Sequence, residues 1–97
     1  MIEIVSKRGG YKEQPGDIYC GRPGPYGNPF FLRDERNDEE RDKVCDAFEA
    51  WIQQHLDVVA DLQTAVNNAF RLFGKCRLVC WCAPRRCHCE SYVRRLK

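Results

Sequence analysis

The segment VCWCAPRRCHC (79–89) holds four cysteines and one histidine within eleven residues. Thiols and imidazoles bind transition metals, act as nucleophiles and carry protons near neutral pH. Three interpretations therefore compete for this segment. It forms a metal site, it presents a reactive thiol beside a base, or its cysteines are small residues of the core.

A metal site in this segment would use Cys80, Cys82, Cys87 and His88. Zinc prefers four tetrahedral ligands of sulfur and nitrogen, and three cysteines with one histidine satisfy that preference. The spacing C-x-C-x4-C-H is tighter than the usual cysteine pairs, which are separated by two to four residues. The adjacent Cys87 and His88 would therefore reach one ion only with some strain.

A reactive thiol is the second interpretation, and Cys87 is its candidate. This residue lies at the expected start of the last helix, beside Arg85, Arg86 and His88. The positive end of a helix and nearby cations both lower the pKa of a thiol. Cys87 would then be the catalytic nucleophile, with His88 or His55 as the acid or base.

A structural role is the third interpretation, because cysteine is among the most buried residue types. Cys45, Cys76 and Cys89 lie at positions typical of packing residues. If the whole cluster packs in this way, the free N–H groups at the start of the last helix would bind a phosphate. The sequence leaves the three interpretations open.

A second unusual segment, GRPGPYGNPF (21–30), holds three glycines, three prolines and one asparagine. Proline removes backbone donors and glycine permits positive φ, so the segment is neither a helix nor a ladder strand. Such a loop is either a long connection or an element that shapes a ligand site, and long irregular loops in small domains favour the second alternative. We expect a ligand site whose binding residues are Gly21, Arg22, Gly27, Asn28, Arg85 and Arg86.

The remaining pattern predicts the elements that must position these two segments. Strands are expected at 2–7, 18–20 and 76–82, with Trp81 in the core. Asn37 and Glu40 resemble a capping pair at the start of a helix, and a helical pattern ends at Gly74. Two helices separated near Asp57 are expected between these points, and a single helix bent near His55 is the alternative. A basic helix of about ten residues closes the chain. This order predicts a single α/β domain spanning 1–97, with a short, mainly parallel sheet flanked by helices.

The two irregular segments each follow a predicted strand. Ligands of open parallel sheets bind outside the carboxyl ends of the strands. If the strands at 18–20 and 76–82 are parallel neighbours, the loop at 21–30 and the CAPRRCH loop (82–88) meet at one edge. We expect a pocket there for a phosphate-bearing ligand, either a nucleotide or a nucleic-acid end.

Composition sets further limits on the protein. The 97 residues are 43% hydrophobic and 31% charged, a balance typical of one globular domain. No apolar run approaches the roughly 20 residues that cross a bilayer, and the first residues lack a signal-peptide core. We expect a cytoplasmic protein with reduced thiols and no membrane contact.

Charge is distributed unevenly along the chain. Residues 34–49 carry eight acids and three bases, whereas residues 85–97 carry five bases and one acid. Two alternatives remain for these segments: both are solvated helix faces, or the basic end meets phosphate or an acidic partner.

The segments YCGRPGPYGNPFFL and KCRLVCWCAPRRCHCE resemble the two signatures of domain of unknown function 4326, a family of phage and bacterial proteins. Those signatures read GR-x-x-x-x-GNPF and L-x-CWCAP-x-x-CH-G/A-D, and the resemblance covers about residues 15–93. The chain departs from them at Cys89 and Glu90, where the family has a small residue and an aspartate. The matching positions are Gly21, Arg22, Gly27, Asn28, Pro29, Phe30, Cys80, Trp81, Cys82, Ala83, Pro84, Cys87 and His88.

The resemblance implies a setting, often a phage genome and hence the host cytoplasm, but no settled activity. A second hypothesis follows from that setting: an accessory protein that binds and inhibits a host protein. Its contact surface would be the acidic helix beginning near Asp34 or the basic last helix. The cysteine and histidine cluster would then be structural, with or without zinc.

Overall fold

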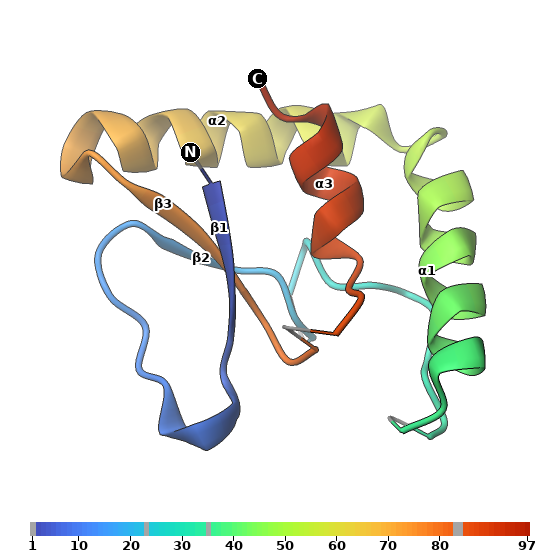
Figure 1. Ribbon diagram of the computed structural model, residues 1–97. Helices are drawn as coiled ribbons and strands as arrows, with labels where there is room; N and C mark the ends of the chain where they lie inside the picture. Colours follow the sequence, from blue (N-terminus) through green and yellow to red (C-terminus); the bar gives the residue numbers. More distant parts are fainter. Residues whose placement is uncertain (1, 23, 35, 83–84) are drawn as a thin grey trace.

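A three-stranded parallel sheet forms the centre of the fold (Figure 1). Its strands are β1 (Ile2–Ser6), β2 (Asp17–Tyr19) and β3 (Cys76–Cys80), arranged in the order β1-β3-β2 with both pairings parallel. The predicted α/β class with a short parallel sheet is confirmed. The computed structural model of the chain describes residues 2–22, 24–34, 36–82 and 85–97.

Three α-helices accompany the sheet, and a short 3-10 helix, η1 (Arg8–Gly10), follows β1. The helices are α1 (Asp38–Ile52), α2 (Leu56–Phe73) and α3 (Cys89–Arg95). All three contribute to one buried cluster against the same face of the sheet, the face that carries alternate residues of β3. That cluster contains Cys20, Phe48, Ile52, Leu62, Val66, Ala69, Cys76, Leu78, Cys80, Cys87, Cys89 and Tyr92.

The opposite face of the sheet carries polar links to the segment between β1 and β2. The Tyr11 hydroxyl donates to Asp17 at 2.6 Å. Arg77 of β3 donates to the same carboxylate at 2.7 Å and reaches Gln14 at 3.2 Å. These bonds fasten the β1–β2 connection to the sheet, so that only one face is left for the helices.

The helix ends follow local side-chain chemistry. Asn37 is the N-cap of α1, and its Oδ1 accepts the backbone N–H of Glu40 at 3.0 Å, as predicted. Gly74 ends α2 with a left-handed φ of 70°, also as predicted. α1 ends at Ile52 and α2 begins at Leu56 with His55 as its N-cap, so the two helices separate before Asp57 rather than at it. The last helix is shorter than expected, at seven residues.

Trp81 corrects one of the predictions. β3 ends at Cys80, and the Trp81 side chain is 46% exposed rather than part of the core. The indole lies on the side of the sheet away from the helices, where its Nε1 donates to the Tyr19 hydroxyl at 2.9 Å. A hydrogen-bonding partner on that side, together with the end of the strand, explains why this aromatic residue is not buried.

The acidic and basic segments bind each other. Arg86 donates to Asp42 at 3.1 Å and to Asp46 at 2.8 Å, both on α1. On α3, Arg94 donates to Glu49 at 2.6 Å, and Arg95 donates to its other carboxylate oxygen. Acidic residues of α1 and basic residues near the carboxyl terminus therefore pair with each other, and these pairs hold the carboxyl-terminal segment against α1.

This attachment makes a prediction for Glu49. Hydrogen bonds from Arg95 and then Arg94 lower the pKa of Glu49 from 4.5 to about 2. A carboxylate whose pKa falls on folding stabilises the fold above its unfolded pKa, and that contribution is lost as the pH falls from about 4.5 to about 2. Glu49→Gln should therefore lower the free energy of unfolding by about 1 kcal/mol at pH 7, measured by urea denaturation.

The matched control is Glu39→Gln on the same helix, because Glu39 is 84% exposed and its contact with Lys43 is 3.8 Å long. We expect that substitution to change stability little. The difference between wild type and Glu49→Gln should shrink as the pH approaches 2. An equal loss of stability at pH 7 and pH 2 would contradict the ionic origin of the effect.

Candidate functional site

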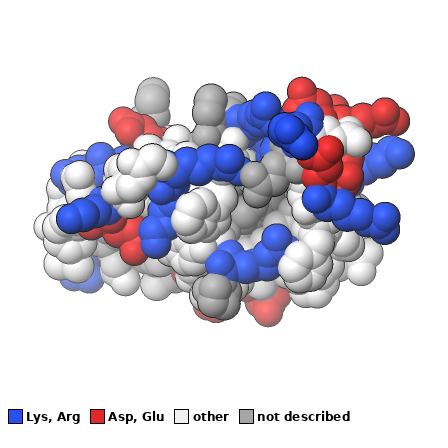
Figure 2. Space-filling model, turned by 90° about the horizontal axis from the view of Figure 1, so that it is seen from below, with Lys and Arg blue, Asp and Glu red and all other residues white. Residues whose placement is uncertain are grey.

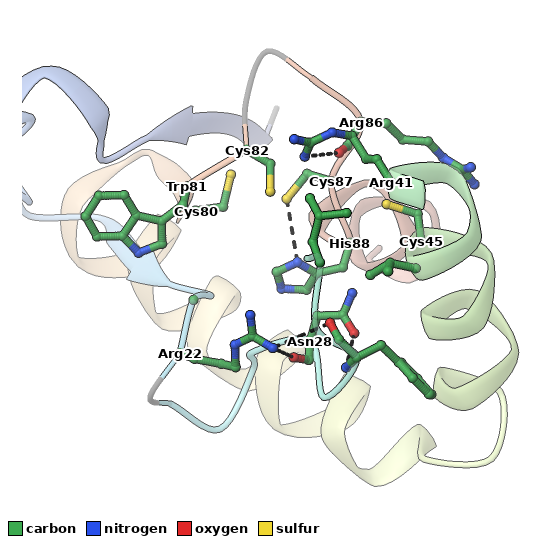
Figure 3. A pocket seen from close by; sticks show the side chains of 14 residues that line it. Arg22, Asn28, Arg41, Cys45, Cys80, Trp81, Cys82, Arg86, Cys87 and His88 are labelled. Atoms are coloured by element: carbon green, nitrogen blue, oxygen red, sulfur yellow. Dashed lines mark hydrogen bonds between the residues drawn. The ribbon is translucent and has the colours of Figure 1, made fainter. Parts of the chain in front are cut away.

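A pocket opens where the carboxyl ends of the strands meet α1 (Figure 3). Its cavity measures about 100 Å³, and both irregular loops contribute to its wall. The expected meeting of these loops at one edge of the sheet is confirmed. The described lining residues are Gly21, Arg22, Asn28, Phe30, Leu32, Arg41, Val44, Cys45, Cys80, Trp81, Cys82, Arg86, Cys87 and His88.

His88 joins the two loops. Its Nε2 lies 2.7 Å from the carbonyl oxygen of Cys20 and 3.1 Å from that of Tyr26. Both neighbours are acceptors, so Nε2 carries the proton and donates. Burial lowers the pKa of His88 and keeps the ring neutral. Nδ1 therefore presents a lone pair, and it lies 3.6 Å from the sulfur of Cys87.

A thiol cluster lies beside this histidine. The sulfur atoms of Cys80, Cys87 and Cys89 lie within 4.8 Å of one another, and all three residues are buried. Three thiols at such distances can hold a metal ion. Two of the four predicted ligands, Cys80 and Cys87, belong to this triad, while Cys82 and His88 each lie beside Cys87.

Cys89 belongs to this triad, although its sequence position was typical of a packing residue. It lies on α3, fully buried, with its sulfur facing the sulfurs of Cys80 and Cys87. Its pKa is raised by hydrogen bonds to neighbouring thiols, first Cys20 and then Cys80. The C-x-C spacing of residues 87 and 89 is the sequence signal that could have indicated a shared site.

Cys87 does not have the lowered thiol pKa that was expected at a helix start. Hydrogen bonds to Cys80 and then Cys82 raise the pKa of Cys87, and burial adds to the effect. Its backbone N–H, which would have helped to bind an anion, donates instead to the Glu90 carboxylate at 2.9 Å. The start of α3 is therefore already occupied by an acidic side chain of the chain itself.

Cys82 is the thiol with the lowered pKa. The pKa of Cys82 is lowered to about 6, first by a hydrogen bond with Cys87 and then, against the opposing effect of partial burial, by the guanidinium of Arg41. Figure 3 shows the sulfurs of Cys82 and Cys87 directed toward one another at the pocket wall. Cys82 is half-buried and lines the pocket, so its sulfur is accessible from the cavity.

Arg41 is a pocket residue that the sequence reasoning missed. It lies on α1 with only 3% of its surface exposed, and its Nη1 reaches the carbonyl oxygen of Arg86 at 3.4 Å. The signal was present in the sequence: Arg41, Cys45, Phe48 and Ile52 recur at helical spacing on the buried face. A charged residue in that stripe indicates a buried site for its guanidinium.

Arg22 and Asn28 give the glycine–proline loop its shape. Arg22 donates to the carbonyl oxygen of Asn28 at 2.9 Å, and its guanidinium lies 4.0 Å from the centre of the Phe31 ring. The Asn28 Oδ1 accepts the backbone N–H of Phe30 at 2.9 Å. Both residues therefore hold the loop in place while lining the cavity.

The two predicted glycines serve close packing. A Cβ at Gly21 would lie 2.5 Å from the Tyr19 hydroxyl oxygen, and a Cβ at Gly27 would lie 2.8 Å from Cγ of Arg22. The N–H of Gly27 donates to the carbonyl of Gly24 at 3.3 Å, so it does not contribute to an anion cradle. Gly27 is not among the described residues that line the pocket.

The two arginines of the CAPRRCH loop differ. Arg86 lines the pocket, but its guanidinium binds Asp46 and Asp42, which raise its pKa. Arg85 is exposed and is not among the described residues of the lining. Ala83 and Pro84 of the same motif lie outside the described residues.

Comparison with known families agrees with the two signature segments. Residues 4–97 match the family described as Domain of unknown function (DUF4326). The chain belongs to the DUF4326 family. The match covers nearly the whole chain, so the predicted family membership is confirmed. No curated protein and no solved structure matches the chain.

In this DUF4326 chain the two signatures meet through His88 and enclose one cavity. The glycine, asparagine and histidine residues of the two signatures therefore have structural roles: the glycines permit close packing, the asparagine shapes its loop and the histidine joins the two loops. Within the described residues, no helix is both long enough and apolar enough to cross a bilayer.

The thiol of Cys82 generates a prediction that can be tested directly. Because its pKa is lowered to about 6, alkylation by iodoacetamide should proceed with a midpoint near pH 6 in chelator-treated protein. An ordinary thiol would react with a midpoint near 8.5. Peptide mapping by mass spectrometry identifies the modified residue, and Cys82→Ser should abolish the early phase. An early phase that persists in Cys82→Ser would contradict the assignment.

Proposed function

We propose that this protein binds a phosphate-bearing ligand, a nucleotide or a nucleic-acid end, in the pocket between residues 21–30 and 82–88. One observation carries the proposal: three arginines line the cavity, and its described lining contains no carboxylate. The pocket also lies at the carboxyl edge of a parallel sheet, where such folds bind ligands. Figure 2 looks onto this end of the molecule, with basic side chains on several sides of a hollow.

The size of the cavity restricts what enters it. A volume of about 100 Å³ is well below the roughly 300–1,000 Å³ that encloses a drug-sized molecule. A phosphate group fits, whereas a whole nucleotide does not. The remainder of the ligand would lie outside, against the exposed indole of Trp81 at the pocket wall.

The three arginines contribute unequally to the charge of the pocket. Arg86 is offset by two aspartates, and Arg41 lies beside the thiol of Cys82. Arg22 binds the carbonyl oxygens of Asn28 and Phe30, which are neutral, so its positive charge is not cancelled by them. Arg22 is therefore the residue on which phosphate binding should depend most.

Arg22→Gln should weaken binding of a nucleoside monophosphate by about 10-fold, measured by isothermal titration calorimetry. The matched control is Arg71→Gln, because Arg71 is exposed on α2 and bound to Asn68. Thermal melting of both variants shows whether the loop has collapsed. Unchanged affinity in a folded Arg22→Gln variant, or no binding of phosphate by the wild type, would overturn the proposal.

The expected catalytic pair, Cys87 and His88, remains a prediction. The Cys87 thiol is buried with a raised pKa, and the His88 proton is engaged by two carbonyl groups. These observations favour ligand binding over thiol catalysis by Cys87.

A second part of the proposal concerns the thiol triad, and we infer zinc as its metal. Sulfur ligands suit zinc, and buried sites with such ligands are usually structural. The triad supplies three ligands, and Cys82 or His88 would supply a fourth from beside Cys87. The hydrogen bonds of His88 Nε2 would then act as the outer shell that fixes its orientation.

Elemental analysis of protein purified without added metal tests this inference. We expect stoichiometric zinc in the wild type and a loss of zinc in Cys89→Ser. Cys45→Ser is the matched control, because Cys45 is also buried but lies outside the triad. Cys80→Ser provides a second variant if Cys89→Ser does not fold. Wild-type protein without zinc would contradict the assignment.

The host-protein hypothesis remains a prediction. Some of the charged residues of its proposed contact surface form ion pairs within the chain. Asp42, Asp46 and Glu49 of α1 bind arginines of the carboxyl-terminal segment. A cytoplasmic setting, that of the host if a phage encodes the protein, belongs to the proposal as well. All seven cysteines lie among the described residues, and none of them forms a disulfide bond.

A further inference from the structure

We propose that the ligand is the phosphorylated end of a single-stranded nucleic acid, with its end base stacked on Trp81. This inference rests on the proposed function, because the terminal phosphate would occupy the pocket. It adds a second, outer part of the site, formed by Trp81, Tyr19, Lys7 and Arg8. That outer part is what distinguishes a polymer from a free nucleotide.

Trp81 is held firmly although it is exposed. Its indole N–H donates to the Tyr19 hydroxyl at 2.9 Å, and its carbonyl oxygen accepts from Arg8 at 2.6 Å. The Tyr19 hydroxyl in turn donates to the carbonyl oxygen of Arg22 at 2.7 Å. Two hydrogen bonds fix the residue while 46% of its surface stays exposed. A rigid, exposed aromatic ring at a pocket wall is a suitable platform for a base.

Basic side chains surround this platform. The ammonium group of Lys7 lies 5.0 Å from the centre of the Tyr19 ring. Arg8 contacts the backbone of Trp81, and Arg22 lines the pocket behind it. Aromatic rings interleaved with cations are typical of sites that bind single strands, where bases stack and phosphates meet positive charge.

The outer cations indicate a polymer. A mononucleotide would place its one phosphate in the pocket near Arg22 and its base on Trp81. It would then have no charged group left to meet Lys7 or Arg8. A strand carries further phosphates along its backbone, and these would pass over the two outer cations. A duplex end fits less well, because its terminal base is held in a pair and the second strand would also have to lie beside the pocket.

Fluorescence anisotropy with a short labelled oligothymidylate bearing a terminal phosphate tests the inference. Lys7→Gln should weaken its binding by about 3-fold to 10-fold at low salt and reduce the salt slope by about 0.7. The same variant should bind thymidine monophosphate as the wild type does. Trp81→Ala should weaken binding of both probes by about 10-fold. Lys97→Gln is the control, because the carboxyl terminus lies at the other end of the molecule (Figure 1).

The outcomes separate this inference from the proposed function. If thymidine monophosphate binds and the oligonucleotide binds no more tightly, the inference is overturned and the phosphate pocket stands. Equal affinity for the oligonucleotide without its phosphate, or for a duplex, would also overturn it. If neither phosphate nor thymidine monophosphate binds, the proposed function itself fails. Thermal melting of Lys7→Gln and Trp81→Ala confirms that each variant is folded.

Discussion

The hydrogen bonds of His88 hold the rest of the site together. One buried N–H donates to the carbonyl oxygens of Cys20 and Tyr26, which lie more than sixty residues earlier in the chain. Each such bond contributes only about 1 kcal/mol net, but leaving the Cys20 carbonyl without His88 would cost about 1–3 kcal/mol. The Tyr26 carbonyl also accepts from the Tyr92 hydroxyl at 3.0 Å. The rings of Phe48 and Tyr92 pack edge-on against the imidazole and exclude water from these bonds. The two loops meet, and the cavity exists, because this neutral ring bridges them.

The cavity and the thiol triad share a wall. Cys80 and Cys87 belong to both, so a change in the charge of the sulfurs changes the electrostatic potential inside the pocket. A metal bound to these sulfurs would offset thiolate charge and leave the arginines free to attract an anion. Metal binding is therefore expected to favour binding of an anionic ligand. The buried Arg41 lies beside the thiol of Cys82, so the change in thiolate charge would affect this cation most directly.

Much of this arrangement could be predicted from the sequence because it depends on local chemistry. The Asn37 cap, the Gly74 stop and the strand before each irregular loop follow from side chains within a few residues. The parallel order then brings the loops together. The position of Trp81, the burial of Arg41 and the part played by Cys89 depend on contacts between distant segments. Hydrophobicity alone predicts that a tryptophan is buried in the core. The exposure of Trp81 is explained by its hydrogen bond to the Tyr19 hydroxyl, a residue distant in the sequence.

The order of the strands has a consequence for how the protein is made. β3 is the last strand in the chain but the central one in the sheet, so Ile2 pairs with Cys76 and β2 also waits for β3. Neither β1 nor β2 has its hydrogen-bonding neighbour in the sheet until β3 has left the ribosome. Pairings so distant in sequence are slow to form, and unpaired strand edges invite association between nascent chains. Productive folding of this small domain should thus begin only after β3 has been synthesised.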